Sequence, residues 1–216
     1  MGRFALVVFD LDGTLVDSGS DVVGSELHAF ATLGITCPGE EWARQRLGTP
    51  LEELLAEALG APPSAALSER FVAAYREHHY GALYPGSRAF PGTATTLTRL
   101  AASTKLAVAT TRPSEAARHL LQHLGLLSWF CRVQGTDPGL PHKPDPAILH
   151  LLLAELALSP AEALMVGDTD RDVAAGLAAG MVTALVDRHA GTNGVKRGRE
   201  HYRLRELDEL VGLVDA

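Results

Sequence analysis

The sequence predicts an α/β protein: a doubly wound parallel sheet with a smaller helical domain inserted into it. Four runs are apolar without alternation, as strands buried on both faces are: residues 4–9, 105–109, 163–166 and 182–186. Segments with helical spacing separate the later runs, and this alternation is typical of a doubly wound core. Between the first two runs, residues 16–90 contain several helical patterns and no convincing strand.

Turn signals mark the ends of the core elements. Proline opens two helices, at Pro113 and Pro146, where its missing N–H is tolerated. Ser159-Pro160 opens a further short segment. We expect helices over about 93–102, 114–124, 146–157, 171–179 and 206–213, with weaker strands at 131–134 and 201–204.

The inserted region is expected to be helical and separate from the core. Glycine and proline residues divide it into segments of about 20–33, 40–47, 51–59 and 66–83. Its flanks, Val16–Ser20 and Tyr84–Gly92, are candidate hinges. The sequence therefore predicts a core of residues 1–15 and 91–216, with residues 16–90 as a helical lid over the crevice of the sheet.

The composition excludes several classes of partner. The 216 residues carry a net charge of −7 and no lysine- or arginine-rich block, so nucleic acid and anionic membranes are poor candidates. The longest apolar stretch, residues 147–158, is too short to span a bilayer, and no signal-peptide pattern follows Met1. Cys37 and Cys131 lie far apart in the sequence, which favours reduced thiols and a cytoplasmic protein.

Two aspartates end the first apolar run. An ionised carboxylate is costly to bury, but the carboxyl end of a parallel strand opens into the crevice where such sheets bind ligands. Asp10 and Asp12 share a side-chain direction, Gly13 allows a tight turn, and Thr14 adds a hydroxyl. The alternative is an ordinary strand followed by an Asp-Gly turn.

Polar residues also follow the second strand and fill a later turn. Thr110 and Thr111 directly follow residues 105–109, where a hydroxyl and the N–H groups of a helix start suit a phosphate oxygen. An ordinary threonine helix cap is the alternative for this pair. Lys143, one of three lysines in the chain, lies between His142 and Pro144 in a rigid turn. A solvated lysine is the alternative there, and we expect His142 to point elsewhere.

Acidic residues follow the third strand. Asp168 lies at the strand end, and Asp172 reaches the same point from the first helical turn. A favourable charge at a helix start explains Asp170 but not Asp168. If this strand neighbours the first, these carboxylates converge with Asp10 and repel one another unless a hard cation binds, and oxygen ligands suit Mg²⁺ better than zinc.

Four segments together resemble the motifs of the haloacid dehalogenase superfamily. They are DLDGT, VATTR, HKPDP and GDTDRD, which occur in this order along almost the whole chain with a helical insert after the first. The resemblance implies a Rossmann-like core with a small inserted helical cap. It also implies Mg²⁺-dependent phosphoryl transfer through an aspartyl-phosphate.

The resemblance assigns a role to each matching residue. Asp10 is the nucleophile and a metal ligand, and Asp12 is the general acid and base that binds the metal through its carbonyl. Thr110, with Thr111 beside it, and Lys143 bind the phosphoryl group. Asp168 is the remaining direct metal ligand, whereas Asp172 matches a position that more often supports the ligands than binds the metal itself.

The sequence also separates the chemistries of that superfamily. Asp12 argues for phosphoryl transfer, since dehalogenases need no proton donor there, and a cap without lysine in residues 15–90 excludes a phosphonoacetaldehyde hydrolase. Val22 stands where β-phosphoglucomutase-like mutases have a histidine, so a sugar-phosphate mutase is disfavoured. DSGSD resembles the cap start of phosphoglycolate-phosphatase-like enzymes, with Ser20 in place of proline. VATTR departs from the usual T-N-K pattern at Thr111 and Arg112.

The cap is expected to select the substrate, because the core motifs recognise mainly the phosphoryl group. Arg44, Arg46 and Thr49 are the candidate contacts, and an arginine there can bind a carboxylate, although a solvated helix charge is the alternative. We expect a cytoplasmic phosphatase, monomeric or homodimeric, that acts on a small phosphate ester. A mutase and a non-catalytic phosphate-binding module remain alternatives.

Overall fold

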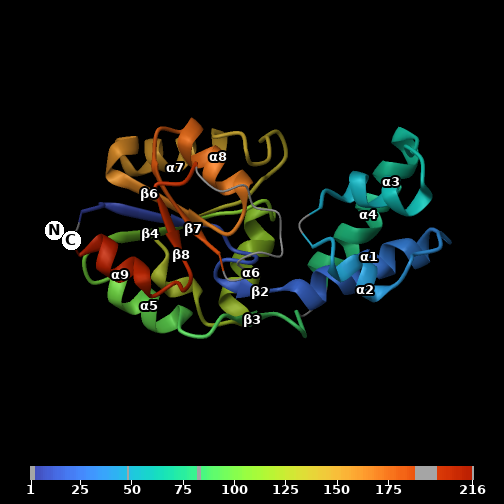
Figure 1. Ribbon diagram of the computed structural model, residues 1–216, viewed down its shortest axis with the longest axis horizontal. Helices are drawn as coiled ribbons and strands as arrows, with labels where there is room; N and C mark the ends of the chain where they lie inside the picture. The colour runs from blue at the N-terminus through green and yellow to red at the C-terminus, as the bar shows by residue number, and fades with distance from the viewer. Residues whose placement is uncertain (1–2, 48, 82–83, 188–198, 216) are drawn as a thin grey trace. The chain divides into compact units, whose positions relative to one another are not determined.

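The computed structural model describes residues 3–47, 49–81, 84–187 and 199–215. The chain forms two compact units (Figure 1). The first contains residues 1–16 and 89–216, and the second contains residues 17–88.

The first unit is built on a six-stranded sheet in which every pairing is parallel. The strand order is β5-β4-β1-β6-β7-β8. The strands are β1 (Leu6–Phe9), β4 (Lys105–Ala109), β5 (Arg132–Gln134), β6 (Ala163–Gly167), β7 (Val182–Val186) and β8 (Tyr202–Leu204). The doubly wound parallel sheet predicted from the apolar runs is confirmed.

Helices cover both faces of this sheet. Figure 1 shows α7 (Ala147–Leu156) and α8 (Asp170–Ala178) on one face, with α5 (Thr93–Leu100) and α9 (Glu209–Val214) on the other. The remaining helix of this unit, α6 (Ser114–His123), packs against β5. The side chains of β1 are buried throughout. Alternate strand residues face each layer, so Leu6 and Val8 contribute to the core under α7 and α8.

The order of the strands places the crevice at β1. The chain adds β4 and β5 on one side of β1, then returns to add β6, β7 and β8 on the other. This reversal lies between β1 and β6, and it leaves a crevice at their carboxyl ends, where open α/β sheets bind ligands. Phe9 of β1 is level with Val166 of β6, so the residues that follow both strands meet there.

The second unit is helical. It contains α1 (Gly19–Thr32), α2 (Glu40–Arg44), α3 (Leu51–Leu59) and α4 (Ala65–Gly81). Helix α1 packs along α4, and Phe30 and Phe71 form the centre of a core with ring centroids 4.7 Å apart. Two short strands, β2 (Val16–Asp17) and β3 (Arg88–Ala89), pair where the chain leaves and re-enters the first unit.

Strands β2 and β3 were not predicted from the sequence. Each strand has only two residues, too few for an alternating pattern to register. Helix α2 is shorter than the expected 40–47, and the last residues of the expected helix 66–83, residues 82 and 83, lie outside the described residues. No helix in the described part of the chain is long and apolar enough to cross a membrane.

One carboxylate is buried in the second unit. Glu26 on α1 is 2% exposed, and among the described residues none hydrogen-bonds its Oε2. Burial raises the pKa of Glu26 to about 7, because the ionised form is poorly solvated. The neutral form therefore stabilises the fold most fully below the unfolded-state pKa, and this contribution is lost as the pH rises toward 7.

Replacing Glu26 by the apolar Met, of similar length, is expected to remove this loss. The unfolding free energy at pH 8 rises relative to the wild type by up to about 3 kcal/mol, with a smaller difference at pH 5. Urea unfolding at the two pH values measures the effect. Glu53→Met, at an exposed position of α3, is the control and gives the same difference at both pH values. Equal effects of Glu26→Met at pH 5 and pH 8 contradict the prediction.

Candidate active site

Asp10 directly follows β1 in the crevice. Its N–H donates to Val166 O at 2.8 Å, which ties its backbone to β6. The side chain is buried, and burial raises its pKa well above the ordinary value. Lys143 opposes this rise, whereas the carboxylates of Asp172 and Asp168 add to it. A buried aspartate beside two others is costly, so this site holds more negative charge than a fold alone needs.

Gly13 and Thr14 bring the turn after β1 against Asp168. Gly13 has a φ of 89°, and a Cβ at this position would collide with the Asp168 carboxylate, so only glycine fits. Thr14 Oγ1 lies 2.9 Å from Asp168 Oδ1 and 3.3 Å from Asp10 Oδ2, within reach of both acceptors. Burial and the charge of Asp172 raise the pKa of Asp168 to about 7, although the Thr14 hydrogen bond opposes the rise.

Asp172 serves the helix and the site at once. Its Oδ2 accepts hydrogen bonds from Thr169 N (3.1 Å) and Thr169 Oγ1 (2.6 Å), and the first of these bonds belongs to the capping box of α8. Its Oδ1 lies 2.5 Å from Lys143 Nζ. Both oxygens of Asp172 are thus engaged by protein groups.

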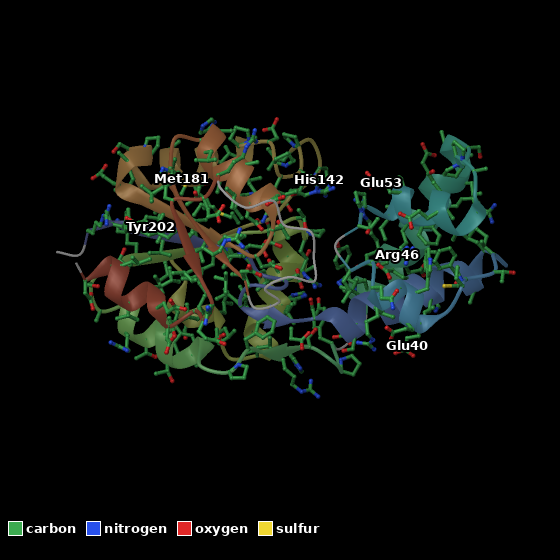
Figure 2. All side chains as sticks on the ribbon, viewed as in Figure 1. Glu40, Arg46, Glu53, His142, Met181 and Tyr202 are labelled. Carbon is green, nitrogen blue, oxygen red and sulfur yellow. The ribbon has the colours of Figure 1, made fainter. Side chains whose placement is uncertain are left out.

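Lys143 is buried at the centre of these groups. Its Nζ donates to Asp10 Oδ1 (2.5 Å), Asp172 Oδ1 (2.5 Å) and Ala109 O (3.0 Å), so each of its three hydrogens has an acceptor. Burial lowers the pKa of Lys143, but the two carboxylates raise it above its ordinary value overall. The solvated alternative for Lys143 is therefore wrong, whereas the neighbouring His142 is exposed (Figure 2).

The acidic cluster fits a hard cation. Asp10, Asp168 and Asp172 each offer an oxygen, and these atoms lie within 4.8 Å of one another. All the donors are carboxylate oxygens, which suit Mg²⁺ and not a soft metal. A bound cation also removes the repulsion that raises the pKa of Asp10 and of Asp168.

Thr110 lies on the other side of Asp10, at the end of β4. The residue at the start of α6 is Pro113, and Thr110 Oγ1 instead accepts the N–H of Arg112 at 3.1 Å. The simple helix-cap alternative does not describe this threonine. Its hydroxyl hydrogen can be donated to an anion, and the side chain is buried, whereas Thr111 is exposed.

Arg112 is the site residue whose contact the sequence analysis missed. Its Nη2 and Nε lie 2.6 Å and 3.1 Å from the two carboxylate oxygens of Asp12, which makes a bidentate ion pair. The departure of VATTR from the usual T-N-K pattern was the only signal of it in the sequence. Motif position alone did not reveal the partner, which is 100 residues away in the chain.

The three candidate specificity residues lie in the second unit. Arg44 pairs with Glu40 at 2.7 Å on the exposed face of α2. Arg46, labelled in Figure 2, pairs with Glu57 at 2.6 Å and lies over the ring of Trp42, 4.4 Å from its centroid. Thr49 donates its N–H to Arg46 O, and Gly48 beside it lies outside the described residues. Their role in specificity stays a prediction.

Comparison with known proteins places the motifs in a family. The family model described as haloacid dehalogenase-like hydrolase matches residues 7–186. The phosphoglycolate phosphatase of Yersinia pseudotuberculosis is 34% identical over 178 residues, which cover 81% of this chain and 77% of that protein. The tyrosine-protein kinase PtkA of Mycobacterium tuberculosis is 36% identical over 184 residues, 84% of this chain and 61% of that protein.

A solved structure has the same fold. The haloacid dehalogenase-like hydrolase SP0104 from Streptococcus pneumoniae superposes with a TM-score of 0.84 at 25% identity. The superposition covers 97% of this chain and 98% of that one. The likeness therefore includes both units of the chain and not the sheet alone.

The pairing of Lys143 predicts how its loss affects stability. Lys143→Met leaves Asp10 and Asp172 buried without their cation, and breaking such a pair costs about 3–5 kcal/mol. Without the ammonium that opposes it, the raised pKa of Asp10 rises further, so the loss of stability is largest at pH 7.5 and shrinks at pH 5.5, where a proton neutralises this carboxylate.

Urea unfolding in EDTA at both pH values measures this loss. The control is Lys105→Met, which removes an exposed lysine at the start of β4 and is expected to change stability little. A loss for Lys143→Met that is equal at the two pH values, or absent, would show that the ammonium does not compensate these carboxylates.

Proposed function

The chain belongs to the haloacid dehalogenase-like hydrolase family as a phosphoric monoester hydrolase, and on that premise we propose that it hydrolyses a small phosphorylated metabolite through an aspartyl-phosphate. The observation that carries the proposal is the convergence of Asp10, Lys143 and Asp168 at the carboxyl ends of β1 and β6. A nucleophilic carboxylate, a fixed cation and an oxygen-only metal site are the parts that phosphoryl transfer requires.

Asp10 is the proposed nucleophile. One of its carboxylate oxygens attacks phosphorus, and the bond from phosphorus to the ester oxygen breaks in line with it. The Lys143 ammonium, 2.5 Å from Asp10 Oδ1, orients the carboxylate and offsets the charge that gathers on the phosphoryl oxygens. Thr110 is suited to donate its hydroxyl hydrogen to one of those oxygens.

Asp12 is the proposed acid and base. As a carboxylic acid it gives its proton to the departing alkoxide, which leaves as an alcohol. The resulting carboxylate then takes a proton from water as the water oxygen attacks phosphorus. This second step releases inorganic phosphate, restores Asp10 as a carboxylate and returns the proton to Asp12.

The acidic cluster is proposed to hold Mg²⁺, with Asp10 and Asp168 as side-chain ligands, the carbonyl of Asp12 as a third and Asp172 in support. The ion would supply charge neutralisation of the phosphoryl group and favour the ionised, attacking form of Asp10. The raised pKa of Asp168 supports this assignment, because burial and the charge of Asp172 disfavour its ionised form and a cation beside it favours that form.

The substrate class is proposed from the relatives and from the cap sequence. The similar Yersinia protein is named a phosphoglycolate phosphatase, so phosphoglycolate and sugar phosphates are the first esters to test. Arg44, Arg46 and Thr49 remain the proposed specificity residues, and cytoplasm is the proposed location.

Replacing Asp10 tests the nucleophile. Asp10→Asn is expected to abolish release of inorganic phosphate from p-nitrophenyl phosphate, because an amide cannot attack phosphorus in place of a carboxylate. The matched control is Asp170→Asn, at an exposed position in the first turn of α8, which keeps wild-type turnover. Circular dichroism confirms that both variants are folded. Turnover of p-nitrophenyl phosphate by folded Asp10→Asn would contradict the assignment of Asp10 as the nucleophile.

Mg²⁺ is expected to stabilise the protein as well as activate it. In EDTA, phosphate release falls to background and returns on addition of Mg²⁺. The melting temperature rises with Mg²⁺ concentration in the wild type because the ion binds only the folded cluster. In Asp168→Asn, which removes one ligand charge, the rise shifts to higher Mg²⁺ concentrations. An unchanged Mg²⁺ dependence in that variant would place the ion elsewhere.

Counting products separates the alternatives. A phosphatase releases one phosphate for each ester consumed, whereas a mutase converts a sugar phosphate to its isomer with little free phosphate. A panel of phosphate esters, with phosphoglycolate and sugar phosphates first, is followed by both assays. ATP together with a tyrosine-containing protein is added to the panel as a test of kinase activity, because one relative is named a tyrosine-protein kinase. Binding without turnover across the panel would favour a non-catalytic module.

A further inference from the structure

We propose that Arg112 is a positioning residue for the reaction: its guanidinium fixes the orientation of the Asp12 carboxylate. This inference rests on the proposed function, in which Asp12 moves the proton in both steps. Arg112 occupies a position where the motif usually has another residue, and its buried guanidinium is paired with Asp12.

The contact between the two side chains is specific in geometry. Arg112 Nη2 and Nε face Asp12 Oδ1 and Oδ2 at 2.6 Å and 3.1 Å, so the plane of the carboxylate is set by the plane of the guanidinium. A carboxylate has about four acceptor positions, and a bidentate arginine uses two of them. The pairing with Arg112 therefore takes one acceptor position of each Asp12 oxygen.

Burial distinguishes this pair from a surface salt bridge. The Arg112 side chain is 3% exposed, whereas that of Asp12 is 29% exposed. The guanidinium is thus enclosed by protein, and only the carboxylate end of the pair opens to solvent. Exposed ion pairs contribute little to stability, and their side chains sample several rotamers. An enclosed arginine is already restricted to one orientation before any substrate binds.

The backbone of Arg112 is held just as firmly. Its N–H donates to Thr110 Oγ1 at 3.1 Å, and its carbonyl accepts the N–H of Thr136 at 3.1 Å. Gly135 allows this close approach, because a Cβ there would collide with the Arg112 carbonyl. Asp137 accepts hydrogen bonds from Ser114 N (2.9 Å) and Ser114 Oγ (2.7 Å), which join the loop of residues 135–137 to the start of α6.

These contacts form a chain of support that ends at the proton carrier. The loop of residues 135–137 holds the Arg112 backbone in place. Because the side chain is enclosed by protein, its guanidinium has a fixed position, and the guanidinium in turn orients the Asp12 carboxylate. Asp12 lies on the turn that Gly13 forms after β1, and Arg112 adds support to it from the end of the neighbouring strand β4. Misplacing a catalytic group by about 1 Å costs up to about 100-fold in rate, so such support matters for catalysis.

The test compares an ester that needs a proton donor with one that does not. p-Nitrophenolate leaves without a proton, whereas the alcohol of an alkyl phosphate needs one. The two substrates are p-nitrophenyl phosphate and the alkyl ester that the wild-type protein hydrolyses best in the panel above. Because kcat/KM covers the steps up to departure of the leaving group, it isolates the acid role of Asp12.

Arg112→Met is expected to lose about 10- to 100-fold in kcat/KM on the alkyl ester and less than about threefold on p-nitrophenyl phosphate. On the aryl ester kcat falls while kcat/KM holds, because water activation by a misplaced Asp12 becomes slow. Rapid mixing then shows a burst of about one p-nitrophenolate per site. Arg112→Lys, which keeps the charge but not the fork, lies between Arg112→Met and the wild type.

Asp12→Asn provides the reference, and Arg132→Met provides the control. Asp12→Asn shows the same discrimination between the two esters, and adding Arg112→Met to it costs less than about twofold more, because Arg112 acts through Asp12. Arg132 is an exposed arginine on β5 that pairs with Glu155, and its replacement leaves both esters unaffected. If Arg112→Met fails to fold, Arg112→Lys carries the comparison.

The outcomes separate the inference from the proposed function. If Asp12→Asn loses equally on both esters, Asp12 is not the proton donor, and the proposed function fails in that step. The positioning role is wrong, while the proposed function stands, if Asp12→Asn discriminates between the esters and the Arg112 variants do not behave as expected. That is the case if the Arg112 variants lose kcat/KM equally on both esters or lose none. It is also the case if the effect of Arg112→Met adds in full to that of Asp12→Asn.

Discussion

One ammonium group determines how the site is arranged. Lys143 donates to Asp10, Asp172 and the carbonyl of Ala109, which lie directly after β1, on α8 and at the end of β4. The desolvation of three neighbouring aspartates is tolerable only with a cation among them. Because every hydrogen of Lys143 is used, the lysine cannot shift toward one partner without leaving another. The carboxylates are therefore held in a single arrangement before any ligand binds.

The register of the sheet places the residues that surround Lys143. Phe9 is level with Val108 of β4 and with Val166 of β6, so three strands end within about one residue of each other. The residues that follow them are Asp10, Thr110 and Asp168, each one or two positions past the last paired residue. Parallel register alone thus gathers the proposed nucleophile, a hydroxyl and a proposed metal ligand, and no long loop is needed to bring them together.

Much of this arrangement could be predicted from the sequence. The apolar runs identified four of the six core strands, and the other two were weaker candidates at 131–134 and 201–204. Acidic residues after a buried strand identified Asp10 and Asp168, because charge is rarely found there without a reason. What could not be predicted was pairing between side chains far apart in the chain. The contact of Arg112 with Asp12 depends on how two strand ends face each other, and periodicity carries no information on that. The strands β2 and β3 could not be predicted for a different reason, since a strand of two residues is too short to show an alternating pattern.

The pairing of β2 with β3 has a consequence for how such a protein can change. The chain leaves the sheet unit and returns to it through neighbouring, hydrogen-bonded strands, so the two ends of residues 17–88 are already side by side. The entropy of closing a loop grows only with the logarithm of its length once the ends are held together. The sheet is therefore almost indifferent to the size and sequence of what is inserted. Helices can be lengthened, lost or exchanged in that segment over evolution while the phosphoryl-transfer machinery is inherited unchanged.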